Sequence, residues 1–333
     1  MTSRTKTILA GAALAAVLAL GQPGHAADAI PTKAEPGTLK MGIEPWLGYG
    51  QWYVAAKKGI FEQQGLSKVD IVNFTEDKDI NAALASGQVD AANIATHTAM
   101  GMIAAGLPVK AVMLLDFSLT ADAIIAGKDV KTVADLKGKN VAFEQGTTSD
   151  ILLNYALAQN GMTIADVKPV PMPAADAGSA LLAGRVPVAV TYEPYIAAAR
   201  KQDPNVNLVY TAGKDPGLVS DVLVVTDDAI KNKPGQVLAL VRSWGEALKA
   251  YDADKTAGRK VIAEGVGSSP EELASAFDGV KYYSLEENKQ SFNVDFRTKT
   301  FDDVLKAAKK AGLVTKDVTA AEMLDPDFVA AAK

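Results

Sequence analysis

Residues 83–92 read Ala-Leu-Ala-Ser-Gly-Gln-Val-Asp-Ala-Ala, and residues 180–189 read Ala-Leu-Leu-Ala-Gly-Arg-Val-Pro-Val-Ala. The two stretches lie 97 residues apart and agree at Ala, Leu, Gly, Val and Ala in register. Each pattern predicts the end of a helix, a turn at glycine and the start of an apolar strand. We interpret this repeat as an internal duplication.

A second matched pair precedes the two copies. The apolar strand Met41–Ile43 is followed by Glu44, a Gly-containing loop and a helix that ends at glycine. Val141–Phe143 is followed in the same way by Glu144, a Gly-containing loop and a helix. Two such strand–helix units predict two lobes, and two lobes enclose a cleft.

Apolar strands alternate with helical patterns over the first two thirds of the chain, which predicts parallel sheets of an α/β fold. The predicted strands are Leu39–Ile43, Val69–Phe74, Ala91–Ile94, Lys110–Leu115, Val141–Phe143 and Val188–Tyr192. From Asp227 to Lys333 the pattern becomes almost wholly helical, and we expect this part to pack on the first lobe. One of its helices is predicted to begin at Ser269, because Pro270 and Glu272 follow as N-terminal signals.

Two segments predicted to connect the lobes also resemble each other. Thr120–Ala126 and Val219–Val225 each place an aspartate, Asp122 or Asp221, before a β-type run. A chain that leaves the first lobe at one segment and returns at the other forms a two-strand hinge, for which closure over a ligand is the expected motion. The predicted first lobe comprises residues 38–119 and 222–333, and the second comprises residues 120–221.

The N-terminus has the layout of a secretory signal peptide. Arg4 and Lys6 precede the apolar run Ile8–Leu20, and small residues follow up to Ala26. The run is too short to span a bilayer, which takes about 20 residues. Residues 1–26 are therefore predicted to be removed, with cleavage near Ala26, and the mature protein is predicted to be periplasmic and not membrane-spanning.

Composition excludes several classes of protein. The formal charge of −5 and the absence of a basic stripe argue against a nucleic-acid partner. The chain contains no cysteine, and His97 is the only histidine after the predicted cleavage site, which argues against zinc clusters and serine triads. No phosphate-binding or dinucleotide-binding glycine motif is present. We predict no cofactor, no metal and no catalytic residue.

A hydroxyl-rich loop follows the predicted strand Val141–Phe143. Gly146 is followed by Thr147, Thr148 and Ser149 at the start of a helix, where N–H groups and hydroxyls favour an oxyanion. The alternative is that one of these hydroxyls is an ordinary helix N-cap.

An aromatic loop occupies the matching place in the first lobe. Trp46, Tyr49 and Trp52 lie within seven residues in a Gly-rich stretch. We interpret the two tryptophans as a wall of the ligand site rather than as core residues.

The chain resembles a known family in several of these motifs. They are Glu44–Tyr49, Ala55–Phe61, Ala83–Asp90, Asp116–Ser118, Asp135–Lys139 and Tyr192–Tyr195. They are similar to those of the nitrate, sulfonate and taurine type of periplasmic binding proteins of ABC importers, a group that includes the pyrimidine-precursor binders of thiamine salvage. The resemblance implies a type II periplasmic-binding-protein fold with two Rossmann-like lobes joined by a two-strand hinge. It also implies a small-molecule ligand and, as partners, a membrane permease with its cytoplasmic ATPase. Pro187 departs from the aspartate that the family usually carries there.

The predicted ligand-binding residues come from the loops that follow the strands. They are Glu44, Trp46, Tyr49, Thr96, His97, Asp116, Ser118, Asp122, Thr147, Thr148, Ser149, Tyr192, Glu193 and Asp221. For His97 the alternative is a structural polar residue at a strand end. The acids and Glu144 can each have a structural role as well, because carboxylates at strand ends often bond loop N–H groups.

The acids limit which ligand can bind, because placing an anion a few ångströms from a carboxylate costs on the order of a few kcal/mol of binding free energy. They disfavour bare nitrate and favour an amino-sulfonate such as taurine, with its sulfonate on residues 147–149 and its ammonium near carboxylates. A cationic, amine or pyrimidine-precursor ligand is the alternative. A more remote alternative is an enzyme of thiamine-pyrimidine synthesis, although the chain lacks the cysteine-rich motif that we associate with that activity. We expect a monomer that closes on its ligand without turnover.

Overall fold

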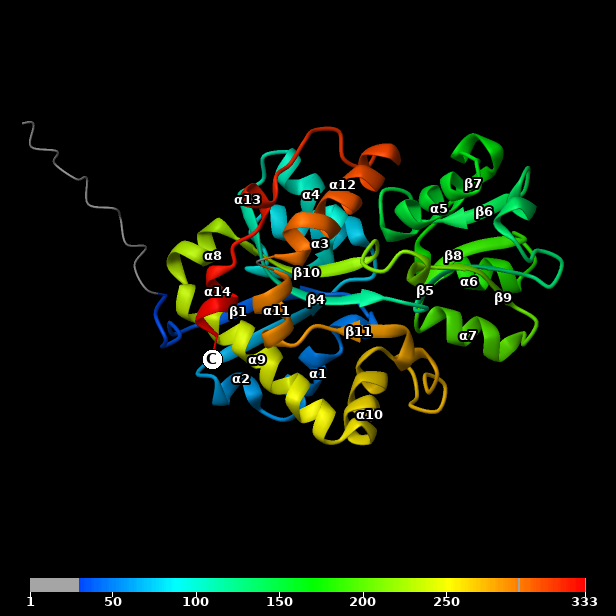
Figure 1. The fold of residues 1–333 in the computed structure, drawn as a ribbon. Coiled ribbons are helices and arrows are strands. Elements are labelled where there is room, and N and C mark those ends of the chain that lie inside the picture. Colours follow the sequence, from blue (N-terminus) through cyan, green and yellow to red (C-terminus); the bar gives the residue numbers. More distant parts are fainter. Residues whose placement is uncertain (1–29, 293, 333) are drawn as a thin grey trace, which may run out of the picture.

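The computed structural model describes residues 30–292 and 294–332, which form two β-sheets flanked by helices (Figure 1). The predicted signal peptide, residues 1–26, lies outside the described residues. Within the described ranges, no helix combines the length and the apolar character that a membrane crossing needs.

The first sheet has the strand order β11-β4-β10-β3-β1-β2. Its strands are β1 (Thr38–Ile43), β2 (Lys68–Asn73), β3 (Ala91–Ala95), β4 (Val109–Ser118), β10 (Ser220–Thr226) and β11 (Val280–Tyr282). β1 pairs in parallel with β2 and β3, whereas β10 runs antiparallel to both β3 and β4. The edge strand β11 was not predicted from the sequence.

The second sheet has the strand order β7-β6-β8-β5-β9 and repeats this arrangement. Its strands are β5 (Asp122–Ala126), β6 (Asn140–Phe143), β7 (Lys168–Pro171), β8 (Val188–Tyr192) and β9 (Asn207–Thr211). β6 pairs in parallel with β7 and β8, and β5 runs antiparallel to β8 and β9. The predicted fold of two similar α/β lobes is confirmed.

The duplicated stretch performs the same step in both sheets. In the first copy α3 ends and the chain turns at Gly87 into β3, and in the second α6 ends and the chain turns at Gly184 into β8. The two glycines have φ of 71° and 65°, a left-handed conformation that glycine adopts without steric cost. Val89 and Val186, just before the following strand, are both buried in the core of their lobe.

The chain crosses between the sheets twice. β4 leaves the first sheet at Ser118 and β5 opens the second at Asp122, while β9 ends at Thr211 and β10 re-enters the first sheet at Ser220. Asp122 is the first residue of β5 and Asp221 the second residue of the equivalent strand β10, so Asp221 belongs to the first sheet and not to the second lobe in which its predicted boundary placed it. The two crossings form the two-strand hinge.

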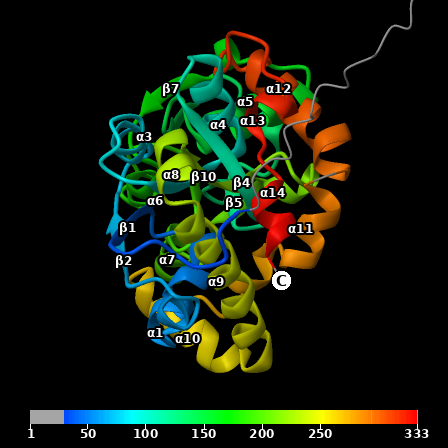
Figure 2. The ribbon, with the colours of Figure 1, turned by 90° about the vertical axis from the view of Figure 1, so that its left-hand side faces the viewer.

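Helices cover both faces of each sheet (Figures 1 and 2). The helices are α1 (Gln51–Lys57), α2 (Ile60–Gln63), α3 (Asp77–Ala85), α4 (Thr96–Ala104), α5 (Thr148–Gln159), α6 (Ala174–Leu182), α7 (Tyr195–Gln202), α8 (Asp227–Asn232), α9 (Pro234–Ala253), α10 (Lys255–Gly265), α11 (Leu285–Ser291), α12 (Phe301–Lys310), α13 (Ala320–Met323) and α14 (Asp327–Ala331). On the first sheet α1, α9 and α10 lie on one face and α4, α12 and α13 on the other. On the second, α5 packs on one face and α6 and α7 on the other.

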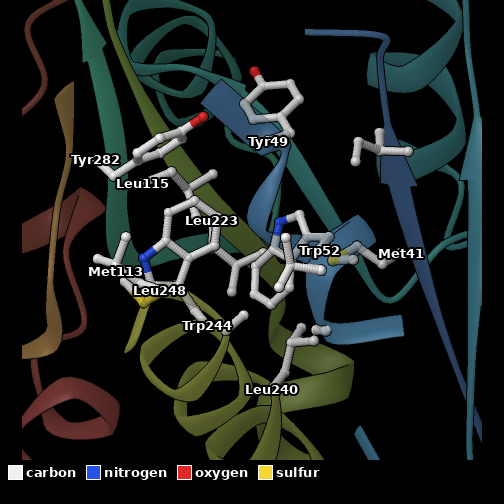
Figure 3. Packing of buried hydrophobic residues seen from close by; sticks show 14 of the residues in the cluster. Met41, Tyr49, Trp52, Met113, Leu115, Leu223, Leu240, Trp244, Leu248 and Tyr282 are labelled. Atoms are coloured by element: carbon white, nitrogen blue, oxygen red, sulfur yellow. The ribbon is translucent and has the colours of Figure 1, made fainter. Parts of the chain in front are cut away.

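The core of the first lobe is built around two tryptophans (Figure 3). The rings of Trp52 from α1 and Trp244 from α9 lie 5.0 Å apart, and Trp52 is fully buried. The indole N–H of Trp52 donates to Asn93 Oδ1 at 2.7 Å, so its polar atom is satisfied inside the core. The expectation that Trp52 faces the ligand is therefore wrong, because α9 covers it.

The segment after Ser269 is not the helix that its sequence predicts. Residues 270–275 form turns that lead into the 3₁₀ helix Ala276–Gly279 and then β11. Ser269 Oγ does accept from the N–H of Glu272 at 3.2 Å, but the Glu272 carboxylate bonds Ser268 and Lys201 instead of closing a capping box. Pairing of β11 with β4 outweighs the local helix signal.

Candidate ligand-binding site

A cavity of about 40 Å³ lies where the strand ends of the two sheets face each other. It is lined by Glu44, Trp46, Tyr49, Asp77, Ala95, Asp122, Thr147, Thr148, Ser149, Ala174, Tyr192, Val219 and Asp221. Most lining residues come after the carboxyl ends of β1, β2, β6 and β7 or are the last residues of β3 and β8. The others lie at the start of β5 or in the first residues of β10 and the position just before it. Ligand sites of α/β sheets form at such strand ends. One water needs about 10–15 Å³ of such space, so this conformation leaves room for only a small group.

Larger hollows lie elsewhere on the molecule. One of about 440 Å³ lies between α5 and α12, and another of about 500 Å³ lies beside α7. Basic and acidic side chains are mixed in both walls, and of the predicted ligand-binding residues only Glu193 lines either hollow, the one beside α7. We therefore take the smaller, strand-end cavity as the candidate site.

Nine of the predicted residues line this cavity. They are Glu44, Trp46, Tyr49, Asp122, Thr147, Thr148, Ser149, Tyr192 and Asp221. Asp77 lines it as well and was not predicted. The signal that could have found Asp77 is its place at the start of a helix directly after β2.

Trp46 connects the two walls of the cavity. Its indole N–H donates to Asp116 Oδ1 at 3.1 Å, and its ring meets the ring of Tyr192 edge-on at 5.9 Å. Gly48 allows this arrangement, since a Cβ at that position would collide with Trp46 Nε1 and with the Asp116 carboxyl group. Asp116 thus lies behind the cavity and orients Trp46.

The cavity is acidic on both sides. Burial raises the pKa of Asp77 to about 7, that of Asp221 to about 7 and that of Asp122 to about 8, and it holds the pKa of Glu44 well above its usual range. Neighbouring carboxylates add to the shifts of Asp77, Asp122 and Glu44. No lysine, arginine or histidine is among the lining residues.

Several carboxyl oxygens in this region have no hydrogen-bond partner. They are Glu44 Oε1, Asp116 Oδ2 and Asp122 Oδ2, all shielded from solvent. Asp116 and Asp221 are also cross-strand neighbours in the β4–β10 pair, and burial together with the Asp221 charge raises the pKa of Asp116 well above its usual range. Buried polar atoms are normally paired, so Glu44 Oε1 and Asp122 Oδ2, which belong to lining residues, are available to a donor.

The hydroxyl-rich loop 146–149, on the side of the cavity that the second lobe forms, already makes several internal hydrogen bonds. Thr147 Oγ1 donates to Glu144 O at 3.0 Å and accepts from Ser149 N at 3.3 Å, and so caps α5. The N–H of Gly146 donates to Asp150 Oδ2 at 2.9 Å. Thr147 is therefore the ordinary helix N-cap that the alternative predicted, although residues 147–149 all line the cavity as well.

Glu144 has a structural partner. Its Oε2 accepts from the N–H of Ala174 at 2.9 Å and holds the start of α6. Burial raises the pKa of Glu144, which is not among the cavity-lining residues.

The remaining predicted residues lie outside the lining. Thr96 bonds Ser220 through their hydroxyls at 2.9 Å, and Ser118 Oγ accepts from Asp122 N at 2.8 Å. His97 is buried at the start of α4, and burial lowers its pKa to about 4. Glu193 lines the hollow beside α7 instead, where its Oε2 accepts from Ala197 N at 2.8 Å.

Among residues 30–292 and 294–332, no group of three or more His, Cys, Asp or Glu side chains is arranged to hold a metal ion. The acids of the cavity are spread around a space rather than converging on one point. The site therefore supports recognition of a solute by hydrogen bonds, charge and aromatic contact.

The family model described as "NMT1/THI5 like" matches residues 48–254, which include most of both sheets. The chain belongs to this family. The match of this NMT1/THI5-like protein to its family model confirms the resemblance seen in its motifs.

Two curated relatives of Escherichia coli (strain K12) carry ligand names. A putative aliphatic sulfonates-binding protein is 30% identical over 176 residues, 52% of this chain and 55% of the relative. The taurine-binding periplasmic protein is 25% identical over 252 residues, 76% of this chain and 73% of the relative. The chain thus spans about half the length of the first of these relatives.

Solved structures share the fold. The alkanesulfonate-binding protein SsuA from Xanthomonas axonopodis pv. citri, bound to MOPS, superposes with a TM-score of 0.72 at 21% identity, over 88% of this chain and 99% of that one. The desulfurization enzyme DSZB superposes with a TM-score of 0.63 at 14% identity, over 89% and 99% of the two chains. The same fold thus occurs in a binding protein and in an enzyme.

Proposed function

We propose that this protein is the periplasmic solute-binding component of an ABC importer. It captures a small organic solute of the sulfonate, taurine and nitrate class between its lobes and delivers it to a membrane permease with a cytoplasmic ATPase. The observation that carries the proposal is the cavity at the facing strand ends, lined by side chains from both sheets. The two moving lobes are residues 38–119 with 220–333 and residues 120–219, a boundary two residues before the predicted one because β10 begins at Ser220 in the first sheet.

An amino-sulfonate such as taurine suits both walls. Its sulfonate would lie against Thr148 and Ser149 at the start of α5, where the helix end favours an anion. Its ammonium would meet the carboxyl groups of Glu44, Asp122 and Asp221. Nitrate suits the cavity less well, because it would add negative charge beside these acids.

A cationic or amine solute, including an aminopyrimidine precursor, is the second candidate. It is favoured by a specific observation: the Thr147 hydroxyl and the Gly146 N–H already have partners, whereas Glu44 Oε1 and Asp122 Oδ2 have none.

Several further properties belong to the proposal. The protein acts without turnover, as the binding proteins among its relatives are named for binding. It is a monomer exported to the periplasm after cleavage near Ala26. Intact mass of periplasmic material tests the export, and a mature form that retains the apolar run Ile8–Leu20 would contradict it.

A thermal-shift screen of the mature protein tests the function. The panel comprises taurine, ethanesulfonate, nitrate, ethylamine and an aminopyrimidine. A ligand at 100 times its dissociation constant adds about 2.7 kcal/mol to the free energy of unfolding, which is a clear rise in Tm. Chemical analysis after incubation should recover the stabilising compound unchanged. No stabilisation by any compound, or its conversion, would contradict the proposal.

A further inference from the structure

We propose that a positively charged group on the ligand is what allows the two lobes to close, because carboxyl groups from both lobes meet in a cavity that no cationic side chain lines. The inference rests on the proposed function and deepens it by naming a protonated amine as the recognised group. The ligand itself then supplies the only countercharge among the groups at the cavity surface.

The opposing acids come from different elements. Glu44, Asp77 and Asp221 lie on the first lobe, after β1, at the start of α3 and at the start of β10. Asp122 opens β5 on the second lobe. The charge of Asp221 and that of Asp77 both act on Asp122, and the charge of Glu144 acts on Glu44, so the repulsion crosses between the lobes.

Two unpartnered oxygens show what the closed cavity lacks. Asp122 is only 6% exposed and its Oδ2 has no donor, and Glu44 Oε1 on the other wall has none either. An ammonium group carries three N–H donors and no acceptor, which matches a space lined by acceptors. A cation held between these two carboxylates would bond both lobes at once.

The two states of the cleft therefore differ in charge balance. Closing it empty buries carboxylates against one another or requires them to take up protons, and both oppose closure. Closing it around an ammonium replaces that repulsion with charge-assisted bonds. A sulfonate without an amine makes the repulsion worse.

Closure can be measured by fluorescence energy transfer. The chain has no cysteine, so Lys58→Cys and Lys128→Cys, both exposed and on different lobes, accept a dye pair cleanly. The probes are taurine, ethylamine and ethanesulfonate, with calorimetry in parallel. We expect transfer efficiency to rise with taurine or ethylamine and not with ethanesulfonate.

The double variant Glu44→Gln/Asp122→Asn removes the two unpaired carboxylates with little change of shape. We expect its affinity for ethylamine or taurine to fall by about a hundred- to a thousandfold, more than for Glu44→Gln alone, and the empty protein to close more readily than wild type. The control Glu62→Gln/Asp129→Asn changes one exposed acid on each lobe and should behave as wild type. If the double variant does not fold, as judged by circular dichroism, Asp122→Asn alone is used.

Closure of wild type by ethanesulfonate as complete as that by taurine would overturn the inference and leave the proposed function standing. Closure by none of the three probes, together with an unchanged Tm across the wider solute panel, would overturn both. An unaltered amine affinity in the variant would overturn the inference alone.

Discussion

Glu44 and Glu144 occupy the same step of the two duplicated units, directly after β1 and directly after β6. One carboxyl oxygen of Glu144 accepts a hydrogen bond from the N–H of Ala174, and Glu144 so stabilises the start of α6 in its own lobe. Glu44 presents an oxygen without a partner and lines the cavity. The duplication thus repeats the backbone and the residue type, while the neighbouring loop decides whether the side chain supports the fold or faces the ligand.

The side chains that the two lobes contribute to the cavity also differ in chemistry. The first lobe contributes an aromatic surface, Trp46 and Tyr49, together with several acids. The second contributes the hydroxyl loop 147–149, Asp122 and Tyr192. Because each wall presents different chemistry, substitutions on the two sides should have separable effects.

The largest effect on ligand affinity should come from neutralising one of the two glutamates by a Glu→Gln substitution. Glu44→Gln should weaken the binding of an amine-bearing ligand by about 1.5–3 kcal/mol, since a hydrogen bond to a charged group is lost. Glu144→Gln should leave most of the affinity and lower the free energy of unfolding by about 0.5–1.5 kcal/mol. Calorimetry and denaturant unfolding measure the two quantities. Equal losses of affinity in both variants would show that the two residues have the same role.

Substitutions of Trp46 and Trp52 should likewise separate an effect on affinity from an effect on stability. Trp46→Ala should lower the affinity for every ligand by about 1–3 kcal/mol through lost apolar contact. Trp52→Phe should instead lower stability and spare affinity, because Trp52 packs against Trp244 beneath α9. Binding unaffected by Trp46→Ala would remove this side chain from the site.

The acids also predict a pH dependence of stability. Burial raises the pKa of Asp122 to about 8 and that of Asp221 to about 7, whereas an unfolded aspartate titrates near 3.9. Above about pH 4 the folded protein therefore holds protons that the unfolded chain has lost, so the stabilisation is full below that pH and falls progressively until it is gone above about pH 8. His97, whose pKa is lowered to about 4, acts in the opposite sense only below about pH 6.5.

We accordingly expect the Tm of the ligand-free protein to fall by several degrees between pH 6.5 and 8.5. Asp122→Asn should flatten this slope, and the exposed control Asp129→Asn should not. A Tm that rises over this range in wild type would contradict the assignment of raised pKa values to these acids in the ligand-free folded protein.

The smallest effect is expected at Glu193. Its carboxylate holds the first turn of α7 and lies outside the cavity. Glu193→Gln should therefore change ligand affinity by less than about 0.5 kcal/mol, as substitutions away from a site usually do. A tenfold loss measured by calorimetry would bring Glu193 back into the site.

Local sequence signals predicted the parts of the molecule that local physics decides. The glycines after α3 and α6 turn the chain into a buried strand, and this requirement is visible in the repeat. The rule that ligands lie beyond strand ends likewise brought Glu44, Trp46, Asp122 and Thr147 together.

Burial by distant segments could not be predicted in this way. Trp52 belongs to the core only because Trp244, far along the chain, covers it, and the signal at Ser269 is outweighed by the pairing of β11 with β4. The orientation of Glu193 toward α7 rather than toward the cleft depends on a backbone N–H four residues later.

The place of β10 between β3 and β4 has a consequence for the order in which the chain can fold. The second sheet uses strands between residues 122 and 211 without interruption, so it can be completed as soon as that stretch has been synthesised. The first sheet keeps a gap at its centre until residues 220–226 emerge, and β3 and β4 present unpaired edges until then. For the proposed export this order is favourable, since the lobe nearest the N-terminus is the last that can become native and the chain therefore stays unfolded for longer.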